Sequence, residues 1–205
     1  MSEDPITIGV DKSISIDLGK LSAPTNRYDA DYAWVEHRPT DAAVSFFFAK
    51  RSRDEGEDLR TRLELRYPPE NLVNHFWANT RTFHSGLQDF VNLWPGRRSW
   101  RDNRLEVSKW KATKDHSEWV NVEAMSHAGS EATIDFYSLS PSGIARYRRG
   151  GASASLRIEP IVRVQLTVFE LLDLLKAVEP IVNEVQRYLP TEDAVRALRE
   201  AREEA

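Results

Sequence analysis

Cysteine is absent from this chain of 205 residues, and so are long apolar runs and any excess of positive charge. Without cysteine the protein forms neither disulfide bonds nor thiolate metal sites, and its composition fits a reducing cytoplasm. No stretch approaches the roughly 18 consecutive apolar residues of a membrane-spanning helix. Residues 1–13 carry no basic flank and no apolar run, so we expect no signal peptide. These absences predict a cytoplasmic protein without a membrane partner.

The formal net charge is −4, which argues against nucleic-acid binding over a broad basic surface but is compatible with a local basic patch. Hydrophobic residues make up 40% of the chain and charged residues 29%, as in ordinary globular proteins. A chain of this length can bury a hydrophobic core either as one large domain or as two small ones.

Motifs for several kinds of catalysis are also missing. The sequence contains no G-x-S-x-G nucleophile motif. Gly96 and the pair Gly150–Gly151 are too isolated to form a phosphate-binding or dinucleotide-binding loop. Carboxylate side chains are abundant, but most occupy alternating strand positions or charged loops, where exposure to solvent accounts for them. We therefore expect no enzyme activity and no cofactor.

An internal repeat is the clearest positive feature of the sequence. Residues 119–136 resemble residues 29–46, and an alignment without gaps places His127 on His37 and Phe136 on Phe46, with a constant offset of 90 residues. Both copies consist of an extended run, a polar turn and a second extended run. This pattern predicts an internal duplication of a small β-rich unit.

The first half contains the alternating pattern of half-buried strands in residues 6–18, 32–38, 43–50 and 59–67. Pro68 and Pro69 end the last of these strands, since proline cannot donate to a sheet but is tolerated in the first turn of a helix. Apolar residues then recur at spacings of three and four as far as the tryptophan at position 94. This spacing predicts an amphipathic helix.

The second half repeats this order. We expect a first strand near residues 105–109, then strands at 119–126, 131–138 and 156–168, and a helix from about residue 169. The fourth strands of the two halves align with an offset of 101 residues. Pro180 lies inside the helical pattern and is expected to kink or end the helix.

The sequence therefore predicts an α+β protein made of two tandem β-β-β-β-α units. Each unit would be an antiparallel sheet followed by an amphipathic helix, and the two units would form a pseudo-dimer about a pseudo-twofold axis. The predicted segments are a first repeat (6–94), a basic and aromatic linker (95–103), a second repeat (104–189) and a charged C-terminal helix (190–205).

Each copy carries a common set of short signals. In the second copy they are Val120-Asn121, His127, Glu131, Asp135 and Phe136, and in the first copy His37, Pro39, Asp41, Phe46 and Pro68-Pro69-Glu70. With these signals each half resembles a small family of uncharacterised bacterial and archaeal proteins, about one repeat long. The second copy departs where Thr167-Val168-Phe169 replaces the proline, and the first copy departs at Ser45. The family has no assigned chemistry, so the resemblance implies an architecture and no activity.

The order of four strands followed by a helix is also similar to that of the export chaperone SecB, which binds unfolded polypeptides. This likeness concerns element order and includes no shared motif. A likeness of fold alone carries little weight for function.

The histidines are the candidates for metal or acid–base chemistry. His37 and His127 occupy matching positions, and the interpretation we favour is a turn histidine that caps backbone groups, because no second ligand lies at metal-binding spacing nearby. His75 and His84 are nine residues apart on one predicted helix, half a turn out of phase. His116 falls in a predicted polar loop. We expect no metal site.

Two predicted loops combine arginine with aromatic residues, and these are the candidate partner-binding residues: Arg97, Arg98, Trp100, Arg101, Arg146, Tyr147, Arg148 and Arg149. Such residues are enriched at protein-binding hot spots, and they also hold phosphates and stack on bases. A solvated linker and loop is the remaining interpretation.

The leading prediction is a non-catalytic binding or assembly module whose partner is a protein. A SecB-like chaperone and a nucleic-acid-binding accessory protein are the alternatives, and self-association stays open.

Overall fold

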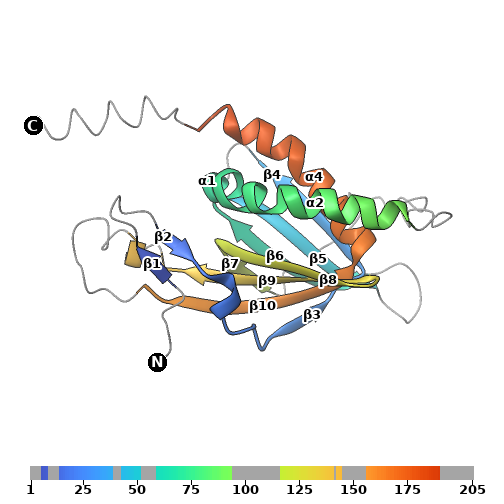
Figure 1. Ribbon diagram of the computed structural model, residues 1–205, viewed down its shortest axis with the longest axis horizontal. Helices are drawn as coiled ribbons and strands as arrows, with labels where there is room; N and C mark the ends of the chain where they lie inside the picture. Colours follow the sequence, from blue (N-terminus) through green and yellow to red (C-terminus); the bar gives the residue numbers. More distant parts are fainter. Residues whose placement is uncertain are drawn as a thin grey trace, which may run out of the picture.

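Two four-stranded sheets with two long helices packed over them form the body of the protein (Figure 1). The structure is a computed structural model that describes residues 6–8, 14–38, 43–51, 59–93, 116–140, 142–144 and 156–189. The linker predicted at 95–103, the strand predicted near 105–109 and the charged helix predicted at 190–205 lie outside these residues.

Ten strands and a few helices have described bounds. The strands are β1 (Ile6–Ile8), β2 (Ile14–Ile16), β3 (Arg27–Asp29), β4 (Tyr32–His37), β5 (Val44–Arg51), β6 (Leu59–Tyr67), β7 (His116–Trp119), β8 (Val122–Ala128), β9 (Glu131–Leu139) and β10 (Ile158–Thr167). The helical segments are η1 (Leu18–Lys20), α1 (Pro69–Asn71), the π-helix η2 (Leu72–Trp77), α2 (Ala78–Asn92) and α4 (Val168–Gln186).

Each sheet takes one strand from the other half of the sequence. The strand orders are β4-β5-β6-β7 and β3-β10-β9-β8. The pairs β6–β7 and β10–β3 are parallel, whereas the other pairs in these two sheets are antiparallel. The predicted α+β class is therefore confirmed, and the sheets are antiparallel-rich rather than wholly antiparallel as expected. The difference lies in the short strands β3 and β7. Each pairs in parallel with a strand from the other half of the sequence, β3 with β10 and β7 with β6.

The chain passes from one sheet to the other at two corners, between β3 and β4 and between β7 and β8. At each corner, two consecutive backbone N–H groups donate to carbonyls in different sheets. The hydrogen bonds run from Ala30 to Gln165 (2.8 Å), Asp31 to Ala49 (2.9 Å), Val120 to Arg66 (3.0 Å) and Asn121 to Tyr137 (3.0 Å). Strands that switch sheets in this way form the corners of many packed β-sheets.

A single large core fills the space between the sheets and the helices. Phe46 and Phe48 of β5 meet Phe136 of β9 at ring-centroid distances of 6.4 and 5.9 Å, so the two sheets contact each other directly. All three rings are fully buried, and burying one such side chain contributes roughly 1.5–3 kcal/mol. Figure 1 shows α2 and α4 on the same side of the strands.

A smaller apolar cluster lies on the opposite face of the sheet that contains β8, β9 and β10. Val122, Tyr137 and Leu139 form its centre, and Ile6 and Ile16 of the β1–β2 hairpin pack against it. The outward-facing Tyr137 and Leu139 of β9 are therefore buried, as are the inward-facing Ile134 and Phe136.

Helix α4 begins at a side-chain cap and continues past its proline. The Thr167 hydroxyl accepts a hydrogen bond from the Glu170 N–H (3.2 Å), which satisfies one of the free donors of the first turn. We expected Pro180 to kink or end this helix; the helix does not end there and extends to Gln186. Pro180 and Lys176, whose carbonyl loses its helical donor, are both exposed, so solvent can hydrate that carbonyl. Among the described residues, no helix has the length and apolar character that crossing a membrane requires.

Candidate functional site

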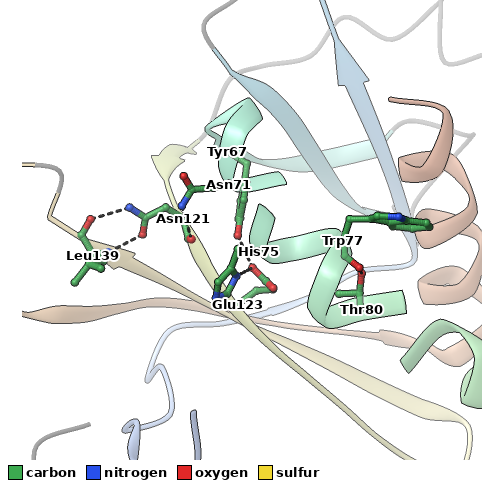
Figure 2. A network of polar contacts seen from close by, with 8 residues as sticks. All are labelled: Tyr67, Asn71, His75, Trp77, Thr80, Asn121, Glu123 and Leu139. Carbon is green, nitrogen blue, oxygen red and sulfur yellow. Dashed lines mark hydrogen bonds and ion pairs between the residues drawn. The ribbon is translucent and has the colours of Figure 1, made fainter. Parts of the chain in front are cut away.

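Three titratable side chains meet inside the core where β6, β8 and the π-helix η2 come together. We name Tyr67, His75 and Glu123 the polar corner (Figure 2). Tyr67 is the last residue of β6 and is fully buried, and Glu123 on β8 has a side chain that is only 2% exposed. The apolar residues around them leave these groups to satisfy one another.

Both partners of Glu123 use the same carboxylate oxygen. The Tyr67 hydroxyl donates a hydrogen bond to Glu123 Oε2, and His75 Nδ1 lies 3.3 Å from that atom. An isolated carboxylate in an apolar interior is strongly unfavourable, so a buried one needs such donors. Tyr67 and His75 together compensate for the solvation that Glu123 loses.

The pKa of Tyr67 is raised well above its ordinary value of 10.0. Burial is the largest cause, because it disfavours the charged phenolate, and the negative charge and hydrogen bond of Glu123 act in the same direction. Tyr67 therefore stays protonated and remains a hydrogen-bond donor throughout the physiological range.

The pKa of His75 responds to two opposing effects. Burial lowers it, whereas the hydrogen bond to Glu123 and the negative charge of that carboxylate raise it, and the net result is above the ordinary 6.5. When neutral, the ring donates from Nδ1 to the carboxylate, an assignment that follows from the partner. This tautomer leaves the lone pair of His75 on Nε2.

The backbone that carries His75 is unusual. Residues Leu72–Trp77 form a π-helix between the short α1 and the long α2. Helical turns of this kind are rare and occur frequently at functional sites. The regular apolar spacing of this region predicted a helix but gave no indication of the π-helical turn.

Two asparagines fix the corner from outside. The Asn121 side chain accepts from the Leu139 N–H and donates to the Leu139 carbonyl, both at 2.7 Å. Asn71 donates to the Asn121 carbonyl at 3.2 Å, so the start of the helix is tied to the turn between β7 and β8. Figure 2 shows this chain of contacts beside the polar corner.

The outer face of the sheet β4-β5-β6-β7 is a second candidate site, which we name the aromatic face. The strand pairing aligns its residues in two rows, Glu36–Ser45–Arg66–Trp119 and Trp34–Phe47–Glu64–Ser117. Side chains alternate along a strand, so these residues lie on the face opposite the buried Phe46 and Leu65.

Direct contacts order the aromatic face. Trp34 stacks on Phe47 with ring centroids 5.1 Å apart. The guanidinium carbon of Arg66 lies 4.9 Å from the ring centroid of Trp119, which is a cation–π geometry. Trp119 remains 47% exposed. Ser45 donates to Glu64 at 3.0 Å.

The predicted partner-binding residues fall outside the described part of the chain, and that prediction stays untested. The residues concerned are Arg97, Arg98, Trp100, Arg101, Arg146, Tyr147, Arg148 and Arg149.

The histidines of the repeat lie on strands and face helices. His37 Nδ1 is 3.6 Å from Glu184 Oε1 of α4, and the His127 ring lies 5.7 Å from Phe83 and 5.4 Å from Phe90 of α2. His116, which we placed in a loop, belongs to β7, because it pairs with β6 across the two halves. Within the described ranges, no three histidine or acidic residues are arranged to hold a metal ion.

Sequence reasoning missed the polar corner. Glu123 was counted among strand carboxylates exposed to solvent, and His75 was considered only as a metal ligand. The available signal was Tyr67, which lies on the apolar face of a predicted strand and whose hydroxyl needs a partner when buried.

Comparison of the chain with protein-family models, with curated proteins and with solved structures found no match.

Proposed function

We propose that the protein is a cytoplasmic, non-catalytic binding module that arose by tandem duplication, and that a protein partner docks on its aromatic face. The duplication and the docking surface rest on separate observations.

Regular offsets in the corner hydrogen bonds support the duplication. The donors Ala30 and Asp31 lie 90 positions before Val120 and Asn121. Their acceptors are offset as well, with Gln165 lying 99 positions after Arg66 and Tyr137 lying 88 positions after Ala49. The parallel strand pairs follow the same rule, since Tyr28 pairs with Val164 and Glu118 pairs with Leu65.

These offsets revise the alignment obtained from the sequence. An offset of 88 places Phe136 on Phe48 rather than on Phe46, and the fourth strands align with an offset of 99 rather than 101. The cause is turn length. Gly129 and Ser130 alone connect β8 to β9, with Gly129 at a φ of 60°, whereas residues 38–43 connect β4 to β5.

A pseudo-dimer follows from the duplication. Each half contributes three strands to one sheet and one strand to the other, as exchanged arms do in a symmetric dimer. In this interpretation the two corners are related by the pseudo-twofold axis, and the single chain replaces two subunits.

The exposed Trp119 beside Arg66 is the observation that carries the binding proposal. Tryptophan and arginine are the residues most enriched at protein-binding hot spots. Glu36, in the same row as Trp119, and Glu64, in the other row, would repel phosphates, so the face favours a protein over nucleic acid. The same charges interrupt the apolar surface that a SecB-like chaperone would need. The aromatic face therefore suits one specific protein partner.

Isolation of the protein from its own host, followed by native mass spectrometry, tests this proposal. We expect one stoichiometric polypeptide, whose affinity falls at least about fivefold (more than about 1 kcal/mol) in Trp119→Ala. Tyr188→Ala is the matched control, because Tyr188 is also exposed but follows α4.

Other results would replace the proposal. A mixture of many unfolded chains would favour the SecB-like chaperone. Nucleic acid released by salt would favour the nucleic-acid-binding accessory protein. An equal loss of affinity in both variants would remove the aromatic face as the docking site.

A further inference from the structure

The polar corner has an apolar counterpart in the same molecule. Under the offsets of the proposed duplication, Tyr67 corresponds to Leu166 and Glu123 to Ala33. The offset of 99 continued from these strands into the helices places His75 on Leu174. These three counterparts are buried in the main core. This step rests on the duplication part of the proposed function and not on the protein partner.

The apolar counterpart differs from the polar corner in side chains that the fold tolerates but does not require. At the positions that correspond to the polar corner, the second corner makes the same sheet-to-sheet crossing with apolar side chains, so a buried carboxylate is not needed to close a corner. Replacing a buried charged cluster by well-packed apolar residues is often neutral or stabilising. A charged cluster kept in one corner therefore indicates a chemical role.

The second ring nitrogen of His75, Nε2, connects the cluster to solvent. Among the described residues, the buried side-chain nitrogen and oxygen atoms without a hydrogen-bond partner are His37 Nδ1 and His84 Nε2. His75 Nε2 is not among them and has no partner in the described part of the chain, so it reaches solvent. The His75 side chain is 29% exposed, which gives access to a single ligand group rather than to a broad protein surface.

We propose that the polar corner is a ligand site in which His75 Nε2 accepts a hydrogen bond from a hydroxyl group on a small molecule. The O–H bond of the ligand stays intact, and the lone pair on Nε2 is the acceptor. Glu123 binds the other ring nitrogen, so the ring presents this acceptor to the ligand while its Nδ1 proton stays on the carboxylate side.

Glu123 and Tyr67 act as positioning residues for His75. Glu123 binds Nδ1 and thereby fixes the tautomer that leaves Nε2 unprotonated. Tyr67 binds the same carboxylate oxygen and holds it against the ring (Figure 2). They are also the titratable groups that face His75 from β8 and β6.

Nitrogen-15 NMR of the wild-type protein gives the first test. We expect neutral His75 to carry its proton on Nδ1, and Glu123→Gln to lower the midpoint of His75 titration by about 1 pH unit or more. A neutral His75 protonated on Nε2 would overturn the proposal, because no lone pair would then face the ligand.

Diethylpyrocarbonate is the small-molecule probe of Nε2, since it acylates unprotonated imidazole nitrogens. Peptide mapping above the His75 titration midpoint should show His75 reacting faster than His127, which is exposed but flanked by Phe83 and Phe90. A His75 rate equal to or below that of His127 contradicts an accessible hydrogen-bond acceptor.

The triple variant Tyr67→Leu/His75→Leu/Glu123→Ala tests whether the cluster is only structural. It copies the apolar corner, and we expect its melting temperature to equal or exceed that of the wild type. A lower melting temperature or a failure to fold assigns the cluster to the scaffold. None of these measurements involves the protein partner, so they remain informative if the docking proposal fails.

Discussion

Tyr67 donates its hydroxyl proton to the carboxylate of Glu123 across 56 positions of sequence, and this bond joins the two sheets inside the core. It connects the last residue of β6 to the second residue of β8, next to the corner where the chain changes sheets. A hydrogen bond to a buried charge is stronger than one between neutral groups. The energetics of the region should therefore be sensitive to this one hydroxyl.

Tyr67→Phe should lower the free energy of unfolding by roughly 1–3 kcal/mol, because Glu123 loses a donor where water does not replace it. Urea unfolding measures the loss. Tyr28→Phe is the matched control, since the Tyr28 hydroxyl donates to the Phe48 carbonyl at 3.3 Å in a partly buried position. The control should cost about 0.5–1.5 kcal/mol. Equal losses would mean that the charge on Glu123 adds nothing.

Stability should depend on pH through His75. Its pKa is raised in the folded protein, so its stabilising contribution is complete below the unfolded value of about 6.5 and is lost as pH rises through the folded pKa. Urea unfolding of wild type and of His75→Leu across this range isolates the effect. The stability of the wild type relative to the variant should fall as pH rises. A difference that stays constant would show that the imidazole does not titrate against Glu123.

Asn121→Ala should be among the more damaging polar substitutions. It removes both hydrogen bonds to the buried Leu139 backbone and leaves one N–H and one carbonyl unpaired, at a cost of about 2–4 kcal/mol in total. Asn26→Ala is the control, because Asn26 donates to the Ile161 carbonyl at 3.3 Å in an exposed position and should cost under about 1 kcal/mol. Thermal unfolding of the two variants provides the comparison.

Arg163→Met should destabilise the sheet of β9 and β10 by roughly 1–3 kcal/mol. Arg163 binds both oxygens of Asp135 at 2.6 Å, and the Asp135 side chain is only 12% exposed. Lys50→Met breaks an exposed pair with Asp29 at 3.5 Å and should cost under about 1 kcal/mol.

A spectroscopic readout accompanies the Arg163 prediction. The pKa of Tyr137 is raised by burial first and by the charge of Asp135 next, while the positive charge of Arg163 lowers it. Loss of Arg163 should therefore raise the pKa of Tyr137 further. An ultraviolet titration that shows no shift to higher pH would contradict this arrangement.

The parts of the fold predicted from sequence are those coded locally. Strand β6 has the predicted bounds of residues 59–67, because its alternation is regular and the prolines at 68 and 69 end it. A helix follows these prolines as predicted, and it begins at Pro69. Both signals depend on residues within a few positions of each other, which is the range over which periodicity is informative.

What could not be predicted depends on distant partners. Strand β3 has three residues and exists because it pairs with β10. The burial of Glu123 depends on Tyr67 and His75, which lie 56 and 48 positions away. From periodicity alone, a carboxylate on a strand is predicted to be exposed. The residues that pack on Glu123 are distant in sequence, so periodicity could not predict the candidate site.

The exchange of β3 and β7 has a consequence for the order of events during synthesis. The Ala30 N–H donates to the Gln165 carbonyl, and this acceptor leaves the ribosome 135 residues later than its donor. Neither sheet is complete until the second half has been made, so the first half must be kept from pairing with neighbouring chains in the meantime. The newborn chain should therefore need protection during translation and should fold slowly afterwards, because closing such distant contacts is entropically costly.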